Sequence, residues 1–155
     1  MALRDVRLIS VAAGGCFSVA ISDAGSVYAW GEGGPRAGFE ADVLLPRRLS
    51  LARPLSDADQ IIAAMAGHTH VLLRTANGKL LTWGSGGDGK LGHGTSEDKA
   101  TPHAVAPLAD VDIIDAAGGM MSSLAIGRDG SVYGWGFASR GAPCNPGGPP
   151  RGSAT

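Results

Sequence analysis

The sequence predicts an all-β protein built from a repeat of about fifty residues. Three Trp-Gly pairs, spaced by 53 and then 52 residues, contain every tryptophan of the chain: Trp30-Gly31, Trp83-Gly84 and Trp135-Gly136. Five residues before each tryptophan lies a further glycine, and these are Gly25, Gly78 and Gly130. A fixed period of this size is the signature of a repeat architecture, in which each repeat is one supersecondary unit.

Each repeat is expected to contain a β-hairpin. Short apolar segments flank a turn that ends in glycine: 18–21 with 27–30, 71–73 with 80–83, and 123–126 with 132–135. Asn77-Gly78 and Asp129-Gly130 supply the positive backbone dihedrals that tight hairpin turns require. The glycine after each tryptophan lets the chain leave the strand sharply. No window of eleven or more residues shows a convincing helical apolar period, so the hairpins decide the fold class.

Composition agrees with a loop-rich β fold and excludes several functions. The chain of 155 residues has 25 glycines, 9 prolines and a formal net charge of −1, from 13 basic and 14 acidic residues. These charges form no basic stripe, so we expect no direct binding of nucleic acid. Cys16 and Cys144 belong to no Cys-x-x-Cys motif, which favours a reducing compartment, the cytoplasm or the nucleus. No stretch approaches the roughly 20 apolar residues of a membrane span, and the apolar run 8–21 aligns with later repeats rather than forming a signal peptide.

Aligned motifs make the repeat more specific. The stretch Gly25-Ser26-Val27-Tyr28-Ala29-Trp30-Gly31 returns as residues 130–136 with Gly134 in place of Ala29, and residues 89–92 read Gly-Lys-Leu-Gly. These motifs resemble the regulator of chromosome condensation family, whose repeat contains Gly-x-Val-Tyr-x-Trp-Gly followed by Gly-Gln-Leu-Gly. The resemblance covers about residues 6–136, with Lys90 in place of the usual glutamine. It implies a seven-bladed β-propeller of antiparallel four-stranded blades.

The repeats divide the chain into domains. We expect propeller repeats over 1–143, at about 8–60, 61–112 and 113–143, and a disordered Gly/Pro-rich tail over 144–155, because proline cannot donate to a β-ladder. This makes a partial propeller of about two and a half blades. Propellers need roughly four to eight blades to close, so we expect a fragment of a seven-bladed ring. The uncovered blade faces predict self-association of the isolated chain.

The candidate site residues are structural. We expect the following positions to hold the repeat: Gly14, Gly25, Trp30, Gly31, Gly67, His70, Gly78, Trp83, Gly84, Gly89, Leu91, Gly92, Gly130, Trp135 and Gly136. The family has histidine at position 70, and we expect its ring to hydrogen-bond the backbone between strands. The partner-binding residues are not assigned by the sequence.

Two motifs that suggest a cofactor or metal site do not support one. Residues 84–89 match Gly-x-Gly-x-x-Gly but no helical pattern follows, so no cofactor-binding site is expected. His68 and His70, with His93 or His103, could in principle ligate zinc, yet spacing ties no carboxylate or cysteine to them. We therefore expect no catalytic, cofactor-binding or metal-binding residues.

The predicted function is that of a protein-interaction module. In its sharpest form the resemblance implies guanine-nucleotide exchange on a small Ran-like GTPase, which needs no covalent chemistry, so the chain is not expected to be an enzyme in that sense. The alternative is a non-catalytic scaffold or substrate-recruiting propeller of a larger multidomain protein such as a ubiquitin ligase. Fold alone does not choose between them.

Overall fold

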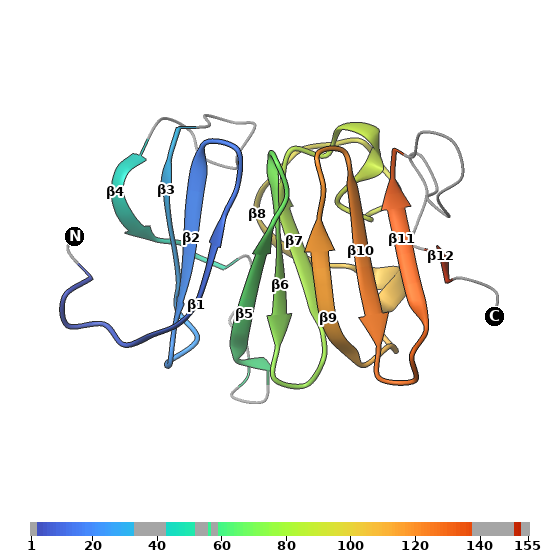
Figure 1. Cartoon of the computed structure of the whole chain (residues 1–155), viewed down its shortest axis with the longest axis horizontal. Coiled ribbons are helices and arrows are strands. Elements are labelled where there is room, and N and C mark those ends of the chain that lie inside the picture. The colour runs from blue at the N-terminus through green and yellow to red at the C-terminus, as the bar shows by residue number, and fades with distance from the viewer. Residues whose placement is uncertain (1–2, 33–42, 52–55, 57–58, 138–150, 153–155) are drawn as a thin grey trace.

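Three four-stranded antiparallel sheets stand side by side in the computed structural model, which describes residues 3–32, 43–51, 56, 59–137 and 151–152 (Figure 1). Within these residues there is no α-helix, and two short 3-10 turns occur, η3 (Gly87–Gly89) and η4 (Ala106–Leu108). No helix of this part of the chain is long and apolar enough to cross a membrane. The predicted all-β class is confirmed, and the sheets are arranged as the blades of part of a β-propeller.

Each sheet is one blade, and each blade begins at a new repeat. Blade 1 contains β1 (Leu8–Ala13), β2 (Phe17–Ser22), β3 (Val27–Gly31) and β4 (Val43–Arg48). Blade 2 contains β5 (Ile61–Ala66), β6 (His70–Thr75), β7 (Leu80–Gly84) and β8 (Lys99–Ala104). Blade 3 contains β9 (Ile113–Gly118), β10 (Ser122–Gly127), β11 (Val132–Gly136) and β12 (Arg151–Gly152).

The repeat places the three tryptophans at one register. Trp30 pairs with Ser18, Trp83 with Val71 and Trp135 with Ser123, in the hairpins β2–β3, β6–β7 and β10–β11. Trp83 and Trp135 are fully buried, whereas Trp30 is partly exposed. Because opposite residues in an antiparallel pair share a face, all three rings point to the same side of their blades.

Each tryptophan is followed by a residue that must be glycine. Gly31, Gly84 and Gly136 have φ angles of 128°, 108° and 93°, which side-chain-bearing residues rarely adopt. A Cβ on Gly31 would lie 2.3 Å from the carbonyl oxygen of Cys16, and one on Gly136 would lie 2.4 Å from that of Met121. The glycine therefore allows the third strand to end against the backbone of the second.

Every blade has two faces, which we name by the neighbour they contact. The forward face points toward the next blade along the chain and the rear face toward the preceding one. Val19, Ile21 and Val27 on the forward face of blade 1 form one cluster with Val71 and Trp83 on the rear face of blade 2.

A second cluster joins the next pair of blades. Leu72 and Leu80 on the forward face of blade 2 pack with Ile113, Ala125 and Trp135 of blade 3. The hydrophobic core therefore consists of two layers between blades rather than one central mass.

The end of the chain contains one short strand that the sequence did not indicate. Two residues of the predicted disordered tail 144–155, Arg151 and Gly152, form β12 and pair with Gly134 and Tyr133 of β11. They follow the last proline of the segment, so their backbone amides are available to the ladder. Blade 3 therefore has a short fourth strand of two residues. The rest of the predicted tail lies outside the described residues.

Candidate functional site

A buried polar network joins blade 2 to blade 3. The His70 ring, fully buried at the start of β6, lies with Nε2 at 2.7 Å from the hydroxyl oxygen of Ser123 on β10. The Ser123 hydroxyl donates to the carbonyl oxygen of Lys90 at 2.8 Å, and Trp135 Nε1 donates to the same oxygen at 2.8 Å. One backbone carbonyl from the loop after β7 thereby binds two side chains of the next blade.

The direction of these hydrogen bonds fixes the state of His70. Because the Ser123 hydroxyl donates its hydrogen to the Lys90 carbonyl, its oxygen must accept a hydrogen bond from His70 Nε2–H. Nδ1 is then an acceptor, and it has no hydrogen-bond partner among the residues that the structure describes. Burial, with a smaller contribution from the Lys90 charge, lowers the pKa of His70 from 6.5 to about 4. The ring is therefore neutral at physiological pH.

The hydrogen-bond partner that the sequence predicted for His70 is therefore wrong. The sequence predicted a hydrogen bond to backbone between strands, whereas the structure gives a bond to a side chain of the next blade. The ring does pack on the backbone of Gly67, where an added Cβ would lie 2.1 Å from the His70 ring. Gly14 has the same relation to Phe17, at 2.3 Å, so the glycine and the ring three residues later form one unit.

The other predicted repeat positions lie on equivalent parts of the blades. The glycines of the turns between second and third strands have positive φ angles of 74°, 77° and 86°: Gly25, Gly78 and Gly130. The remaining group lies in the loop after β7, and its members are Gly89, Leu91 and Gly92. Leu91 is fully buried, and a Cβ on Gly92 would lie 2.9 Å from Trp135 Nε1, so this loop packs closely on blade 3.

The histidines do not assemble a metal site. His93 Nε2 lies 2.9 Å from the Thr82 hydroxyl, and the His93 and His103 rings meet edge to face with centroids 6.2 Å apart. Burial, followed by the His103 and Lys99 charges, lowers the pKa of His93. Within the described part of the chain, no three His, Cys, Asp or Glu side chains come together in a way that could hold a metal ion.

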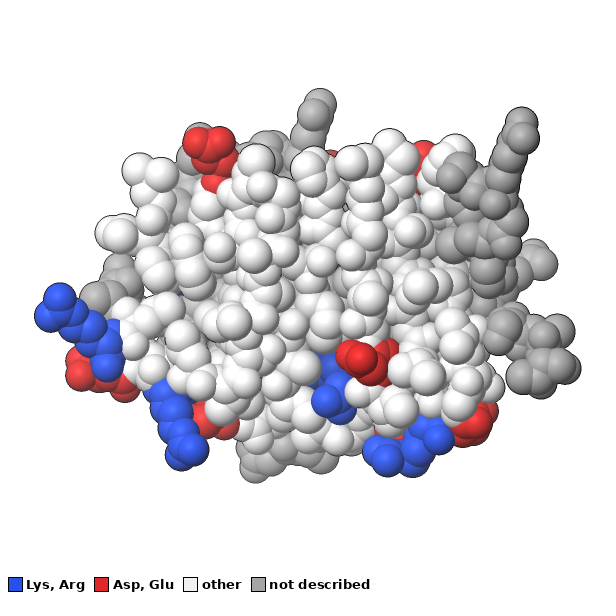
Figure 2. Space-filling model, viewed as in Figure 1, with Lys and Arg blue, Asp and Glu red and all other residues white. Residues whose placement is uncertain are grey.

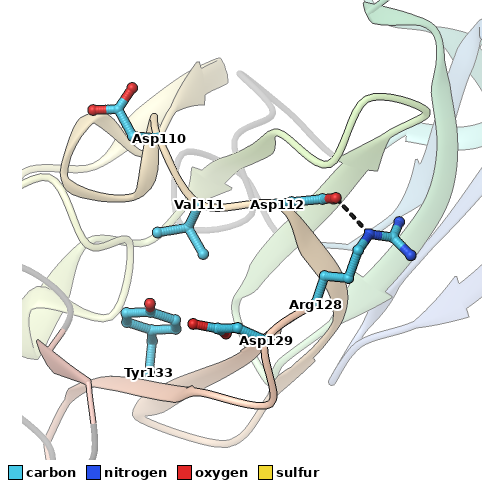
Figure 3. Close-up of a pocket in the computed structure, with 6 residues that line it drawn as sticks. All are labelled: Asp110, Val111, Asp112, Arg128, Asp129 and Tyr133. Carbon is cyan, nitrogen blue, oxygen red and sulfur yellow. Dashed lines mark hydrogen bonds and ion pairs between the residues drawn. The ribbon is translucent and has the colours of Figure 1, made fainter.

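An open pocket of about 490 Å³ lies at the turn end of blade 3 (Figure 3). The segment between η4 and β9 provides Asp110, Val111 and Asp112, and the β10–β11 hairpin provides Arg128, Asp129 and Tyr133. Figure 3 shows the Tyr133 ring beneath Val111, with the Asp129 carboxylate beside it.

Two of its carboxylates are held by neighbours. Arg128 Nε donates to Asp112 at 2.6 Å, which raises the pKa of the guanidinium. The Ser131 amide and hydroxyl donate to Asp129 at 3.0 and 2.9 Å, which lowers the pKa of that carboxyl. Asp110 has no side-chain hydrogen bond among the residues described here. With three carboxylates against one guanidinium, the pocket is suited to a cationic side chain.

The sequence did not reveal this pocket. Arg128 and Asp129 were visible only as a hairpin turn, since aspartate is common in turns for local reasons. A comparison of the three repeats could have indicated it. At the positions equivalent to Arg128-Asp129, blade 1 has Asp23-Ala24 and blade 2 has Ala76-Asn77. The charged pair is therefore particular to blade 3.

In the view of Figure 2 most charged side chains lie toward the lower edge of the molecule, and a smaller acidic group lies at the upper left. The surface over the strands is largely uncharged, and Lys, Arg, Asp and Glu gather along the lower edge. Figure 1 places the turns between β6 and β7 and between β10 and β11 at that edge. The pocket of blade 3 thus belongs to the polar end of the propeller segment.

Comparisons with known proteins agree with this architecture. Two models of the regulator of chromosome condensation (RCC1) repeat match residues 77–126 and 8–34. The mouse E3 ubiquitin-protein ligase HERC2 is 34% identical over 133 residues, covering 84% of this chain and 3% of that protein. A bovine secretion-regulating guanine nucleotide exchange factor is 37% identical over 92 residues, covering 58% of this chain and 19% of that protein.

The solved structures show the same fold. The crystal structure of human WBSCR16 superposes with a TM-score of 0.82 at 22% identity, over 98% of this chain and 39% of that one. The chain therefore spans less than half of each of these relatives.

Proposed function

Because the chain belongs to the RCC1 repeat family, we propose that it is a protein-interaction module and that it promotes guanine-nucleotide exchange on a small Ran-like GTPase. The similarity to an exchange factor over 92 residues supports this version. Exchange needs no reacting side chain, since an exchange factor acts by binding the nucleotide-free GTPase better than the loaded one. A rigid scaffold with exposed loops is suited to such selective binding.

The observation that carries the proposal is the acidic pocket of blade 3. Its size suits one or two side chains of a partner, and its walls are two turns anchored in a β-sheet. Asp110 is exposed and has no side-chain hydrogen bond within the described residues, so its carboxylate is available to a basic residue of the partner. We assign the pocket as the contact for a lysine or arginine side chain of the GTPase.

Release of fluorescent GDP from a Ran-like GTPase tests the proposal. We expect the chain at catalytic concentration to accelerate release, and Asp110→Lys to abolish the acceleration by placing a cation in the pocket. Glu97→Lys is the matched control, because it makes the same change of charge on an exposed side chain in a loop of blade 2. Absence of acceleration across a panel of small GTPases would overturn the exchange function.

The second candidate is a non-catalytic scaffold or substrate-recruiting module. The 34% identity to a segment of HERC2 favours it, since that protein is a ubiquitin ligase of which this chain spans 3%. Binding of a partner that is weakened by Asp110→Lys, without any effect on nucleotide release, would support this candidate. Assays of partner binding and of nucleotide release therefore distinguish the two functions.

We also propose that the 155-residue chain self-associates, because blades 1 and 3 each have one face with no neighbouring blade among the described residues. Exposed apolar side chains occur on both, including Val11 at 72% and Leu124 at 44% exposure. The expected location, cytoplasm or nucleus, stays a prediction that imaging of a tagged chain would test.

A further inference from the structure

The turn between β6 and β7 contains the one Asn-Gly pair of the chain, Asn77-Gly78. The sequence has one other asparagine, Asn145, and proline follows it. Asparagine is a chemically labile residue, because its side chain loses ammonia when the backbone nitrogen of the next residue attacks the amide carbon. Glycine presents the least obstructed nitrogen for this attack, whereas proline has no N–H to react. Asn77 is therefore the one asparagine of the chain that can react in this way.

This deamidation has two steps. The Gly78 nitrogen loses its proton and bonds to Cγ of Asn77, and the bond between Cγ and Nδ2 breaks as ammonia leaves, which gives a cyclic succinimide. Water then adds to one of the two carbonyl carbons of the ring. Opening on one side gives aspartate in a normal main chain, and opening on the other gives isoaspartate, whose main chain is longer by one methylene group. Water and the chain supply all the atoms, so the reaction needs no oxidant or cofactor.

In the folded turn both reacting groups are hydrogen-bonded. The Gly78 amide donates to the carbonyl oxygen of Thr75 at 3.1 Å. Asn77 Nδ2 donates to Asp59 Oδ1 at 2.6 Å, and Asn77 Oδ1 accepts from the Thr75 hydroxyl at 2.5 Å. The Gly78 nitrogen must lose the hydrogen that it donates to Thr75, and the Asn77 amide must be free to rotate. The reaction therefore requires the turn to open first.

The turn is also held by the segments that precede and follow its blade. Asp59 lies between blades 1 and 2, and its second oxygen accepts from the Ser56 hydroxyl at 2.7 Å. The hydrogen bonds from Ser56 and Asn77 lower the pKa of Asp59, so this carboxyl is ionised at neutral pH and acts as an acceptor. On the other side, the Gly78 carbonyl oxygen accepts from the amide of Ile113 at 2.9 Å, at the start of blade 3. The turn of blade 2 thus links all three blades.

We propose that Asn77 is a deamidation site, that its hydrogen bond to Asp59 slows the reaction, and that the product weakens the contacts between blades. An aspartate at position 77 has no hydrogen to donate, and it places a second negative charge beside Asp59. An isoaspartate also lengthens the main chain at Gly78, where an added Cβ would lie 2.1 Å from Asp112 Oδ1. Since Asp112 binds Arg128, this change reaches the wall of the acidic pocket.

Blade 3 shows that an acidic side chain fits the turn itself. Asp129 has the position of Asn77 there, directly before the turn glycine. Its carboxylate accepts from the amide and the hydroxyl of Ser131, at 3.0 and 2.9 Å. We therefore attribute the cost of an aspartate at position 77 to Asp59, which loses a donor and meets a like charge.

Peptide mapping by mass spectrometry during incubation at neutral pH tests the site and its control by Asp59. Conversion of Asn77 should be slower in the folded chain than in guanidinium chloride by at least about tenfold, because ring closure waits for local opening of the turn. Asp59→Ala should accelerate it in the folded chain by about threefold or more, as for loss of an exposed hydrogen bond to a charged group. Asp59→Asn retains an oxygen acceptor and should stay close to the parent. Glu97→Ala, which removes an exposed carboxylate from a loop of the same blade, should leave the rate unchanged.

Thermal unfolding tests the consequence for the blades. Asn77→Asp, which has the composition of the normal-chain product, should lower the melting temperature, and adding Asp59→Asn should restore most of the loss by exchanging donor and acceptor. Equal deamidation rates in the folded and unfolded chain would overturn the protection by the turn, and an unchanged rate in Asp59→Ala would overturn the role of Asp59. No product at Asn77 in the unfolded chain would overturn the site, and an unchanged melting temperature in Asn77→Asp would overturn the effect on the blades. The exchange proposal is independent of these results, which are obtained without a partner.

Discussion

The two interfaces between blades share one backbone geometry and differ in chemistry. Between blades 1 and 2, Phe17, Val71 and Trp83 belong to an apolar cluster. Between blades 2 and 3, the equivalent register contains the His70–Ser123 hydrogen bond, and Trp135 donates to the Lys90 carbonyl. The comparison teaches that one arrangement of strands, with a glycine beneath the ring of Phe17 or His70, accommodates either an apolar or a polar contact at this register.

The largest expected effect comes from the apolar interface. Trp83→Ala should lower the free energy of unfolding by about 3–5 kcal/mol, as for other aromatic truncations in a core, because Trp83 is fully buried. Urea denaturation followed by circular dichroism measures it. Trp30→Ala is the matched control, since Trp30 has the same register but is partly exposed, and its cost should be smaller. A loss below about 1 kcal/mol for Trp83→Ala would mean that this ring does not hold the blades together.

The second effect is a pH dependence that only the polar interface should show. His70 has a pKa of about 4 in the folded chain against 6.5 as its ordinary value. As pH falls through this window the unfolded chain takes up a proton before the folded one, so the free energy of unfolding falls. The pKa difference corresponds to at most roughly 3 kcal/mol, fully present above pH 6.5 and lost as pH falls through about 4.

His70→Phe sharpens the comparison by copying Phe17 into the second interface. This variant should lose the stability change between about pH 6.5 and 4 that His70 contributes, as measured by denaturant unfolding across that range. Phe17→His is the reciprocal change and should introduce a pH dependence into the first interface. An unchanged pH profile in His70→Phe would show that other groups control acid stability.

The smallest of the three effects concerns the partner of His70. Ser123→Ala should cost about 1–3 kcal/mol, because His70 Nε2 loses its acceptor while remaining buried. In the His70→Phe background the same substitution should cost less, since no buried donor is then left unpaired. Equal costs in the two backgrounds, measured by a double-mutant cycle of unfolding free energies, would contradict the hydrogen bond as the source of stability.

Much of the fold could be predicted from local sequence. The Asn-Gly and Asp-Gly turns and the apolar segments that flank them act within one hairpin. Together with the period of the Trp-Gly pairs they predicted the strands β2 and β3 and their equivalents in the other blades. The register of the three tryptophans follows from the same pattern. Such features are readable because each depends on residues that are close in the chain.

The features that were missed depend on contacts between blades. Ser123 lies 53 residues from His70, and nothing within one repeat identifies it as the partner of the ring. The acidic pocket likewise joins a connecting segment at Asp110 to a hairpin at Arg128, and both are ordinary turn sequences when considered alone. β12 was not expected, because the prolines before it argue against a strand, whereas Arg151 and Gly152 follow the last of them and pair with β11.

The Lys90 carbonyl has a consequence for how the repeat tolerates sequence change. The atom that receives the Ser123 and Trp135 hydrogen bonds belongs to the main chain, which every amino acid provides. Lysine in place of the family's glutamine therefore leaves this link between blades intact, provided that the new side chain fits. When hydrogen bonds to a backbone atom join two repeats, the side chain of the residue that provides this atom is free to change. The identity of the side chains matters instead in the next repeat, where a tryptophan and a serine must donate these hydrogen bonds.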